Sequence, residues 1–107
     1  GNFGANHQKM KKISRFAVNI LSSEQTDLAY QFAGQNRDGL SSVADKRAGI
    51  PILHNTLATL ICDKGNIHSE GDHNIIIGEV KEIILGNDNL QPLLYFKSQM
   101  IEDYQHV

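Results

Sequence analysis

The sequence predicts a small β-rich domain in which antiparallel strands are accompanied by one or two short helices. Three segments with strand character follow one another in the second half of the chain, at 56–63, 74–85 and 92–97. Short turn-forming segments separate them, and strands joined in this way pair antiparallel because a parallel pair needs a long crossover. The 107 residues are enough for one domain, so we expect residues 1–107 to fold as a single unit.

Composition excludes several classes of protein. Hydrophobic residues make up 40% and charged residues 21%, which are ordinary globular values and argue against disorder or a fibrous repeat. A net charge of -2 does not suggest a nucleic-acid partner, and the longest apolar runs are far too short to span a membrane. The single cysteine, Cys62, excludes an internal disulfide and fits a reducing compartment. We therefore expect a cytoplasmic protein that binds neither nucleic acid nor membrane.

The first elements can be read from residue spacing. Residues 7–14 predict a short helix because Met10 and Ile13 share one face. Residues 15–21 then predict a strand rich in β-branched and aromatic side chains. Asn19 is the polar residue within that apolar run, and a buried amide needs hydrogen-bond partners. We expect it to hold a neighbouring loop or, as the alternative, to face a ligand.

The next segment predicts a capped helix. Ser22 and Gln25 match a capping box, in which each side chain satisfies a backbone N–H near the other residue. The helix should run from Ser22 to about Ala33 and end at Gly34 in a left-handed conformation. The polar residues 35–48 that follow predict a long loop.

Turns and a glycine organise the second half of the chain. Turn-forming residues at 64–66, 70–72 and 86–89 separate the three expected strands. Gly78 interrupts the longest strand, where a missing side chain indicates a bulge or the close approach of another group.

His73 is the first candidate for chemistry. It follows Gly71 and Asp72 at the start of the longest strand, in a turn that would present the imidazole at a strand end. A histidine there can donate a hydrogen bond, carry a proton or orient a bound ring near neutral pH. The alternative is a polar residue that only completes a turn.

The sequence gives little support for a metal site, a catalytic nucleophile or a common nucleotide-binding motif. Cys62, His68, Asp72 and His73 lack the paired short spacings of zinc sites, so no metal site is predicted. The sequence has no Gly-x-Ser-x-Gly elbow and no Walker or Rossmann glycine pattern. A nucleotide would have to be held in some other way.

An ordered series of segments resembles the flavin reductase-like, FMN-binding split-barrel family. The resemblance covers roughly residues 5 to 98 and is sharpest at Gly71-Asp72-His73. The matching segments are FAVNIL at 16–21, EQ at 24–25, FAG at 32–34, GIPIL at 49–53, ATLIC at 58–62, GDH at 71–73, IGEV at 77–80 and PLLYF at 92–96.

The resemblance implies a fold and an activity. The family forms a Greek-key antiparallel split β-barrel of six strands, and its members are homodimers with flavin near the subunit interface. Typical members use NADH or NADPH to reduce FMN or FAD, and the reduced flavin passes to a partner monooxygenase. The hydride chemistry belongs to the cofactors, so the protein's task would be to hold them in the correct geometry.

The resemblance also implies the site residues. Gly71, Asp72, His73 and Tyr95 would lie beside the nicotinamide, with His73 as the catalytic residue. The loop that touches flavin in relatives falls on Asn6, His7, Gln8 and Lys9, where relatives tend to carry small hydroxyl residues. Ser98 and Met100 stand where the family pattern has glycine and tyrosine, which would alter the pocket floor.

One departure concerns the beginning of the chain. Relatives carry an N-terminal portion with barrel strands and a phosphate-binding loop that would precede residue 1, so we expect a barrel that is incomplete at the N-terminus. Open strand edges invite pairing, which predicts a homodimer. Two alternatives to a flavin reductase follow: a non-catalytic flavin- or heme-binding split-barrel protein, or an inactive truncated homologue.

Overall fold

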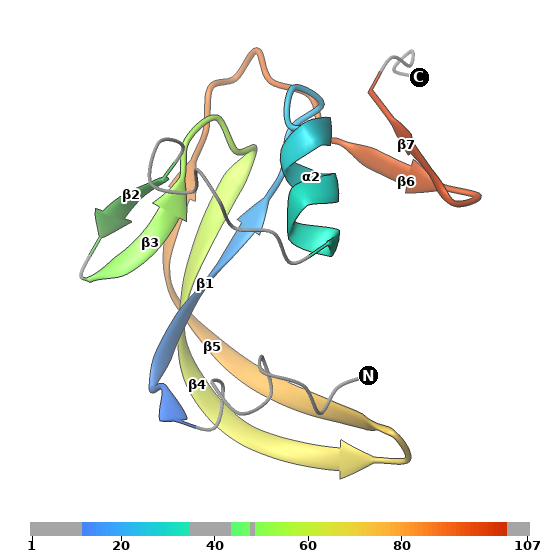
Figure 1. Cartoon of the computed structure of the whole chain (residues 1–107). Helices are drawn as coiled ribbons and strands as arrows, with labels where there is room; N and C mark the ends of the chain where they lie inside the picture. Colours follow the sequence, from blue (N-terminus) through green and yellow to red (C-terminus); the bar gives the residue numbers. More distant parts are fainter. Residues whose placement is uncertain (1–11, 35–43, 48, 103–107) are drawn as a thin grey trace.

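The structure, a computed structural model, describes residues 12–34, 44–47 and 49–102. These residues form antiparallel strands and one helix, as predicted, in three sheets ordered β1-β4-β5, β2-β3 and β6-β7 (Figure 1). The elements are β1 (Arg15–Ile20), α2 (Thr26–Ala33), β2 (Ala44–Arg47), β3 (Ile50–Leu53), β4 (Ala58–Glu70), β5 (His73–Leu85), β6 (Leu94–Phe96) and β7 (Gln99–Ile101).

The β4-β5 hairpin is the longest feature of the fold. Each strand has 13 residues, and the outer half of the hairpin extends beyond β1 as an arm (Figure 1). The strands expected at 15–21 and 74–85 are confirmed. The turn expected at 64–66 is wrong, because β4 continues through it to Glu70 with a register shift between Lys64 and Ile67. Polar residues are tolerated there because most of the arm beyond the shift is exposed to water.

Asn19 has the structural role that the sequence predicts. Its Oδ1 accepts a hydrogen bond from the backbone N–H of Leu53 at 3.2 Å and another from Thr59 Oγ1 at 2.9 Å. One amide therefore joins β1 to β3 and to its neighbour β4. The loop expected at 35–48 is wrong over 44–47, which form β2 and pair with β3. Residues 35–43 lie outside the described part of the chain.

The helix begins later than the capping box predicts. Half of the box is present: Gln25 Oε1 accepts from the Ser22 N–H at 2.9 Å, and Gln25 Nε2 donates to the His54 carbonyl at 2.6 Å. The Ser22 hydroxyl accepts from the Glu24 N–H at 3.4 Å, so it caps a turn that precedes α2. The helix itself starts at Thr26, with Gln25 as an N-cap that makes no side-chain capping bond.

Two further expectations about helices have different outcomes. Gly34 has a φ of -82°, so the predicted left-handed cap is wrong; its N–H extends the helical pattern by bonding to the Tyr30 carbonyl at 2.9 Å. The helix expected at 7–14 lies largely outside the described residues. Over the part of the chain that the structure describes, no helix has the length and apolar character needed to cross a membrane.

Gly78 marks a close approach, as the sequence predicts. A Cβ atom placed on Gly78 would lie 2.7 Å from Cζ of Phe16 and 3.3 Å from Cβ of Cys62. The aromatic ring of β1 therefore reaches across β4 and occupies the space that a side chain on β5 would need. Cys62 between them is a buried free thiol, 3% exposed.

We expect Gly78→Ala to destabilise the domain by about 1–3 kcal/mol, because overpacking a tight contact forces the ring or the strand to move. Chemical denaturation measures the change. Gly34→Ala is the matched control, since the nearest atom to its new Cβ would be 3.5 Å away and the backbone there is right-handed. Replacing the aromatic ring with a smaller side chain, in the double variant Phe16→Leu/Gly78→Ala, should reduce the destabilisation caused by the glycine substitution. An equal destabilisation by Gly78→Ala in the wild-type and Phe16→Leu proteins would contradict the contact.

Candidate functional site

The turn that joins β4 to β5 is built around Gly71. Glu70 and His73 lie opposite each other at the ends of the two strands, so Gly71 and Asp72 form a two-residue loop. Gly71 has a φ of +59°, and a positive φ at the first central position is typical of a type II′ hairpin turn. The glycine thus has a physical reason to precede Asp72 and His73: it closes the turn that presents both side chains at the tip of the arm.

Asp72 and His73 form a hydrogen-bonded pair in that turn. Asp72 Oδ1 lies 2.5 Å from Nδ1 of His73, and the two side chains are 86% and 74% exposed. An ionised carboxylate can only accept, so in the tautomer that makes this hydrogen bond Nδ1 is the donor. Nε2 is left as the ring atom that can meet a ligand. In that tautomer the carboxylate orients the imidazole so that Nδ1 faces Asp72.

Tyr95 lies on a second hairpin, β6-β7. It pairs with Met100 and is 66% exposed, next to Phe96 at 60%. The strand expected at 92–97 is present only at Leu94–Phe96, and the sequence did not reveal its partner β7. Its turn holds Ser98 at a φ of +64°, a conformation that favours glycine, which is the residue the family pattern has at this position.

The two hairpins do not meet within one chain. Figure 1 shows the β4-β5 turn at the outer end of the long arm and β6-β7 beyond the opposite end of the sheet. The structure thus brings together Gly71, Asp72 and His73 but leaves Tyr95 apart from them. The predicted flavin residues, Asn6, His7, Gln8 and Lys9, lie outside the described residues.

The structure also contains hollows that sequence reasoning missed. One of about 350 Å³ lies against α2 and includes His54 and Asn55, and another of about 360 Å³ lies between β1 and β3. Gly49 was the residue in the sequence that could have indicated the hollow between β1 and β3. Its φ of +80° bends the chain between β2 and β3. Arg15 lines this hollow, but its Nε bonds to Asp63 Oδ1 at 3.1 Å, so its charge is already paired.

Neither of these hollows includes a residue of the Gly71-Asp72-His73 turn or Tyr95. Among the residues that the structure describes, no three His, Cys, Asp or Glu side chains gather as a metal site would require. The Asp72-His73 pair is consequently the strongest candidate for recognition chemistry in the described part of the chain.

Comparison with known proteins identifies the family. Residues 4–102 match the flavin reductase like domain. A flavin reductase of Pseudomonas putida is 30% identical over 89 residues, which is 81% of this chain and 52% of that protein. The reductase component of a 4-nitrophenol 4-monooxygenase/4-nitrocatechol 2-monooxygenase from Rhodococcus opacus is 34% identical over 94 residues, 87% of this chain and 50% of that protein.

A solved structure agrees with these sequence matches. The NADH:FAD oxidoreductase SgcE6 of Streptomyces globisporus, in complex with NAD and FAD fragments, has a TM-score of 0.85 and 25% identity. The alignment covers 94% of this chain and 62% of that structure. The chain belongs to the flavin reductase like family. It spans about half the length of the curated relatives that it matches.

Proposed function

We propose that this chain takes part in the NAD(P)H-dependent reduction of FMN or FAD, and that the reduced flavin serves a partner oxygenase. Membership of the flavin reductase like family supports the activity, and the Rhodococcus opacus relative is named as the reductase component of a monooxygenase. The observation that carries the proposal is the Asp72-His73 pair, which is exposed, oriented and held in a glycine turn. Free, buried Cys62 also fits the reducing cytoplasm, where we place the protein.

The described residues fit a nicotinamide. Its carboxamide has both a donor and an acceptor, so it can pair with His73 Nε2 in either protonation state of that atom. The exposed ring of Tyr95 offers a flat apolar face for an aromatic ligand. When bound, the nicotinamide supplies the hydride and the flavin accepts it. The chain's own task is to orient the rings and exclude water, which requires positioned side chains and no nucleophile.

We propose further that the chain acts as a homodimer whose nicotinamide site uses residues of both subunits. In one chain the β4-β5 turn, which holds Asp72 and His73, lies at the outer end of the arm, and the β6-β7 hairpin, which holds Tyr95, lies beyond the other end of the sheet (Figure 1). In such a dimer a two-fold axis would bring the arm of one subunit toward the C-terminal hairpin of the other, and symmetry would make two such sites. Asn6, His7, Gln8 and Lys9 remain the residues proposed to hold flavin.

The activity can be tested by anaerobic titration. FMN and FAD are added in turn to the purified chain, and NADH or NADPH follows while the flavin absorbance is recorded. Binding followed by bleaching supports the reductase. Binding without bleaching would indicate a non-catalytic flavin carrier, and a chain that binds neither flavin would contradict the proposed function.

In the flavin-competent protein, His73→Ala should raise the KM for the nicotinamide substrate or slow flavin reduction by roughly tenfold to a hundredfold. The loss corresponds to one charge-assisted hydrogen bond, which is worth about 1.5–3 kcal/mol. Flavin affinity should stay nearly unchanged. His68→Ala is the matched control, because His68 is an exposed histidine on the same arm, opposite Ile75.

Steady-state and stopped-flow kinetics separate the two substrates. A His73→Ala variant that loses flavin yet keeps its nicotinamide kinetics would show that the assigned role is wrong. Normal turnover with only a small change in stability would show that His73 merely completes a turn.

A further inference from the structure

The tip of the β4-β5 arm places a second acidic side chain opposite His73. Glu70 is the last residue of β4, His73 is the first residue of β5, and the two are paired across the strands. Directly opposed residues of an antiparallel pair point to the same face, with Cβ atoms about 4.5–5.5 Å apart. The Glu70 carboxylate and the His73 imidazole therefore share one face of the arm, and both side chains are exposed.

The neighbouring pair of residues holds this end of the hairpin in register. Ser69 lies opposite Asn74, and Ser69 Oγ donates a hydrogen bond to Asn74 Oδ1 at 2.8 Å. Because side chains alternate along a strand, this bond lies on the other face of the arm from Glu70 and His73. The two strands are thus joined next to the turn by a bond that leaves the Glu70-His73 face open to a ligand.

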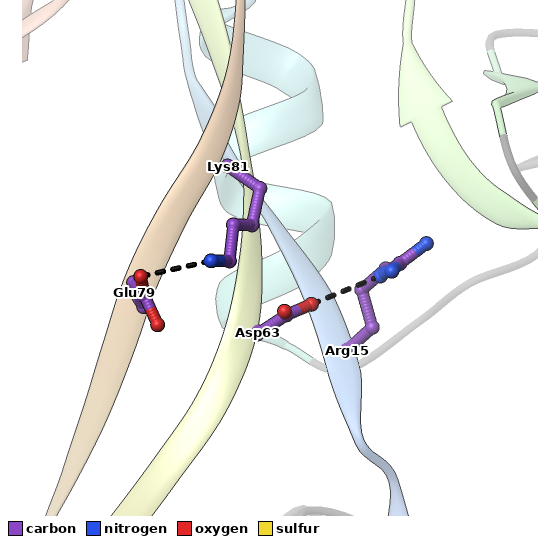
Figure 2. A network of polar contacts seen from close by, with 4 residues as sticks. All are labelled: Arg15, Asp63, Glu79 and Lys81. Carbon is purple, nitrogen blue, oxygen red and sulfur yellow. Dashed lines mark hydrogen bonds and ion pairs between the residues drawn. The ribbon is translucent and has the colours of Figure 1, made fainter.

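Glu70 differs from the other carboxylates of the hairpin, which all have a partner. The pairs are Asp63 with Arg15, Glu79 with Lys81, Glu82 with Arg47 and Asp72 with His73, and Figure 2 shows the first two. The Glu79 carboxylate, for example, raises the pKa of Lys81, chiefly through their hydrogen bond. Among the residues that the structure describes, none forms a hydrogen bond or an ion pair with the Glu70 carboxylate.

The surroundings of Glu70 are acidic. Residues 65–78 contain two carboxylates, Glu70 and Asp72, and neither lysine nor arginine. The side chains of this segment that can become cationic are His68 and His73. A surface of this kind favours a ligand that brings a hydrogen-bond donor or a positive charge.

An apolar side chain adjoins the two polar ones. Ile75 lies two residues after His73, on the same face of β5, and is 49% exposed. The face therefore combines a carboxylate, an imidazole and an apolar neighbour. A flat ring that carries a polar substituent is complementary to this combination.

The carboxamide of a nicotinamide matches the two polar groups. Its amino group has two N–H donors. When Nδ1 of His73 donates to Asp72, Nε2 of the neutral imidazole can accept one of these hydrogens. The Glu70 carboxylate, directly opposite, can accept the other, and the ring would then lie toward Ile75.

A carboxylate beside the ring also distinguishes the two redox states of the nicotinamide. When the substrates are bound, a hydride leaves C4 of the reduced nicotinamide with both electrons of the C–H bond and reduces the flavin, so the neutral ring becomes a cation. A nearby negative charge attracts the cationic ring and has no such attraction for the neutral one.

We propose that Glu70 is a further nicotinamide-binding residue, which accepts a hydrogen bond from the carboxamide and binds the oxidised ring more tightly than the reduced ring. The inference rests on the proposed function, because it extends the nicotinamide site assigned to His73. It gives the unpaired carboxylate a role that Asp72 cannot fill, since Asp72 is already bonded to Nδ1 of His73.

The test is calorimetric titration of the full chain, loaded with whichever of FMN or FAD it binds, with two probes. NAD⁺ has a cationic ring, whereas tetrahydro-NAD has a neutral ring, keeps the carboxamide and has no hydride to transfer. Glu70→Gln keeps an acceptor oxygen but removes the charge. NAD⁺ should therefore bind at least about fivefold more weakly, the factor that a unit charge about 4 Å away contributes even in water, while tetrahydro-NAD binds as to wild type.

Glu70→Ala removes the acceptor as well as the charge. Both probes should then bind more weakly, tetrahydro-NAD by about threefold to tenfold for the lost hydrogen bond. Because Glu70 is exposed at a strand end, circular dichroism of both variants should stay as in wild type. Glu79→Gln is the matched control: it removes one charge from the same hairpin at a carboxylate that is bonded to Lys81, and both affinities should be unchanged.

The outcomes separate this inference from the proposed function. Unchanged NAD⁺ affinity in both Glu70 variants, an equal loss for both probes in Glu70→Gln, or an equal loss of NAD⁺ affinity in Glu79→Gln would overturn the role of Glu70. A wild type that reduces flavin but binds no NAD⁺ at millimolar concentrations would do the same. A wild type that binds neither flavin contradicts the proposed function itself, and the role of Glu70 falls with it.

Discussion

The side-chain amide of Asn19 determines how the sheet of this domain is covered. Its oxygen accepts from the Leu53 N–H and from the Thr59 hydroxyl, so the β2-β3 hairpin is held on one face of β1-β4-β5. Thr59 is 2% exposed, which makes this a buried polar junction that is costly to break. The consequence is an asymmetric sheet. One face carries the hairpin and the paired charges, while on the other face the described residues Val18, Ile20, Val80, Ile83 and Leu85 are exposed.

The same asymmetry explains why the functional groups lie at the periphery. The described hydrophobic residues that are buried are few: Ala29, Leu53, Ile61 and Cys62. They lie near β3, α2 and the centre of β4, far from the tip of the arm. Gly71 forms a turn that needs no packing partner, so Asp72 and His73 are held by local geometry and one hydrogen bond. A pocket around them requires surfaces that one copy of the described residues does not provide.

Sequence reasoning succeeded where a residue has one dominant physical constraint. Asn19 needed partners and Gly78 needed space, and the structure supplies both. The sequence-based prediction failed where the local residue types favour one structure and strand pairing imposes another. Residues 64–66 are typical of a turn, yet they lie within the water-exposed part of strand β4. At the candidate site, residues 71–73 could be identified from the resemblance of their GDH sequence to the family. No periodicity in the sequence shows that Tyr95 lies on a separate hairpin. That separation depends on the length of the β4-β5 arm, which only the pairing register fixes.

The most direct test of this account is subunit complementation. Flavin-competent His73→Ala and Tyr95→Ala proteins are each assayed alone and then after mixing under conditions that exchange subunits. If one site takes His73 from one subunit and Tyr95 from the other, half of the mixed dimers are heterodimers with one intact site, and activity should recover to about a quarter of wild type. Activity equal to the mean of the two variants would contradict a site shared between subunits.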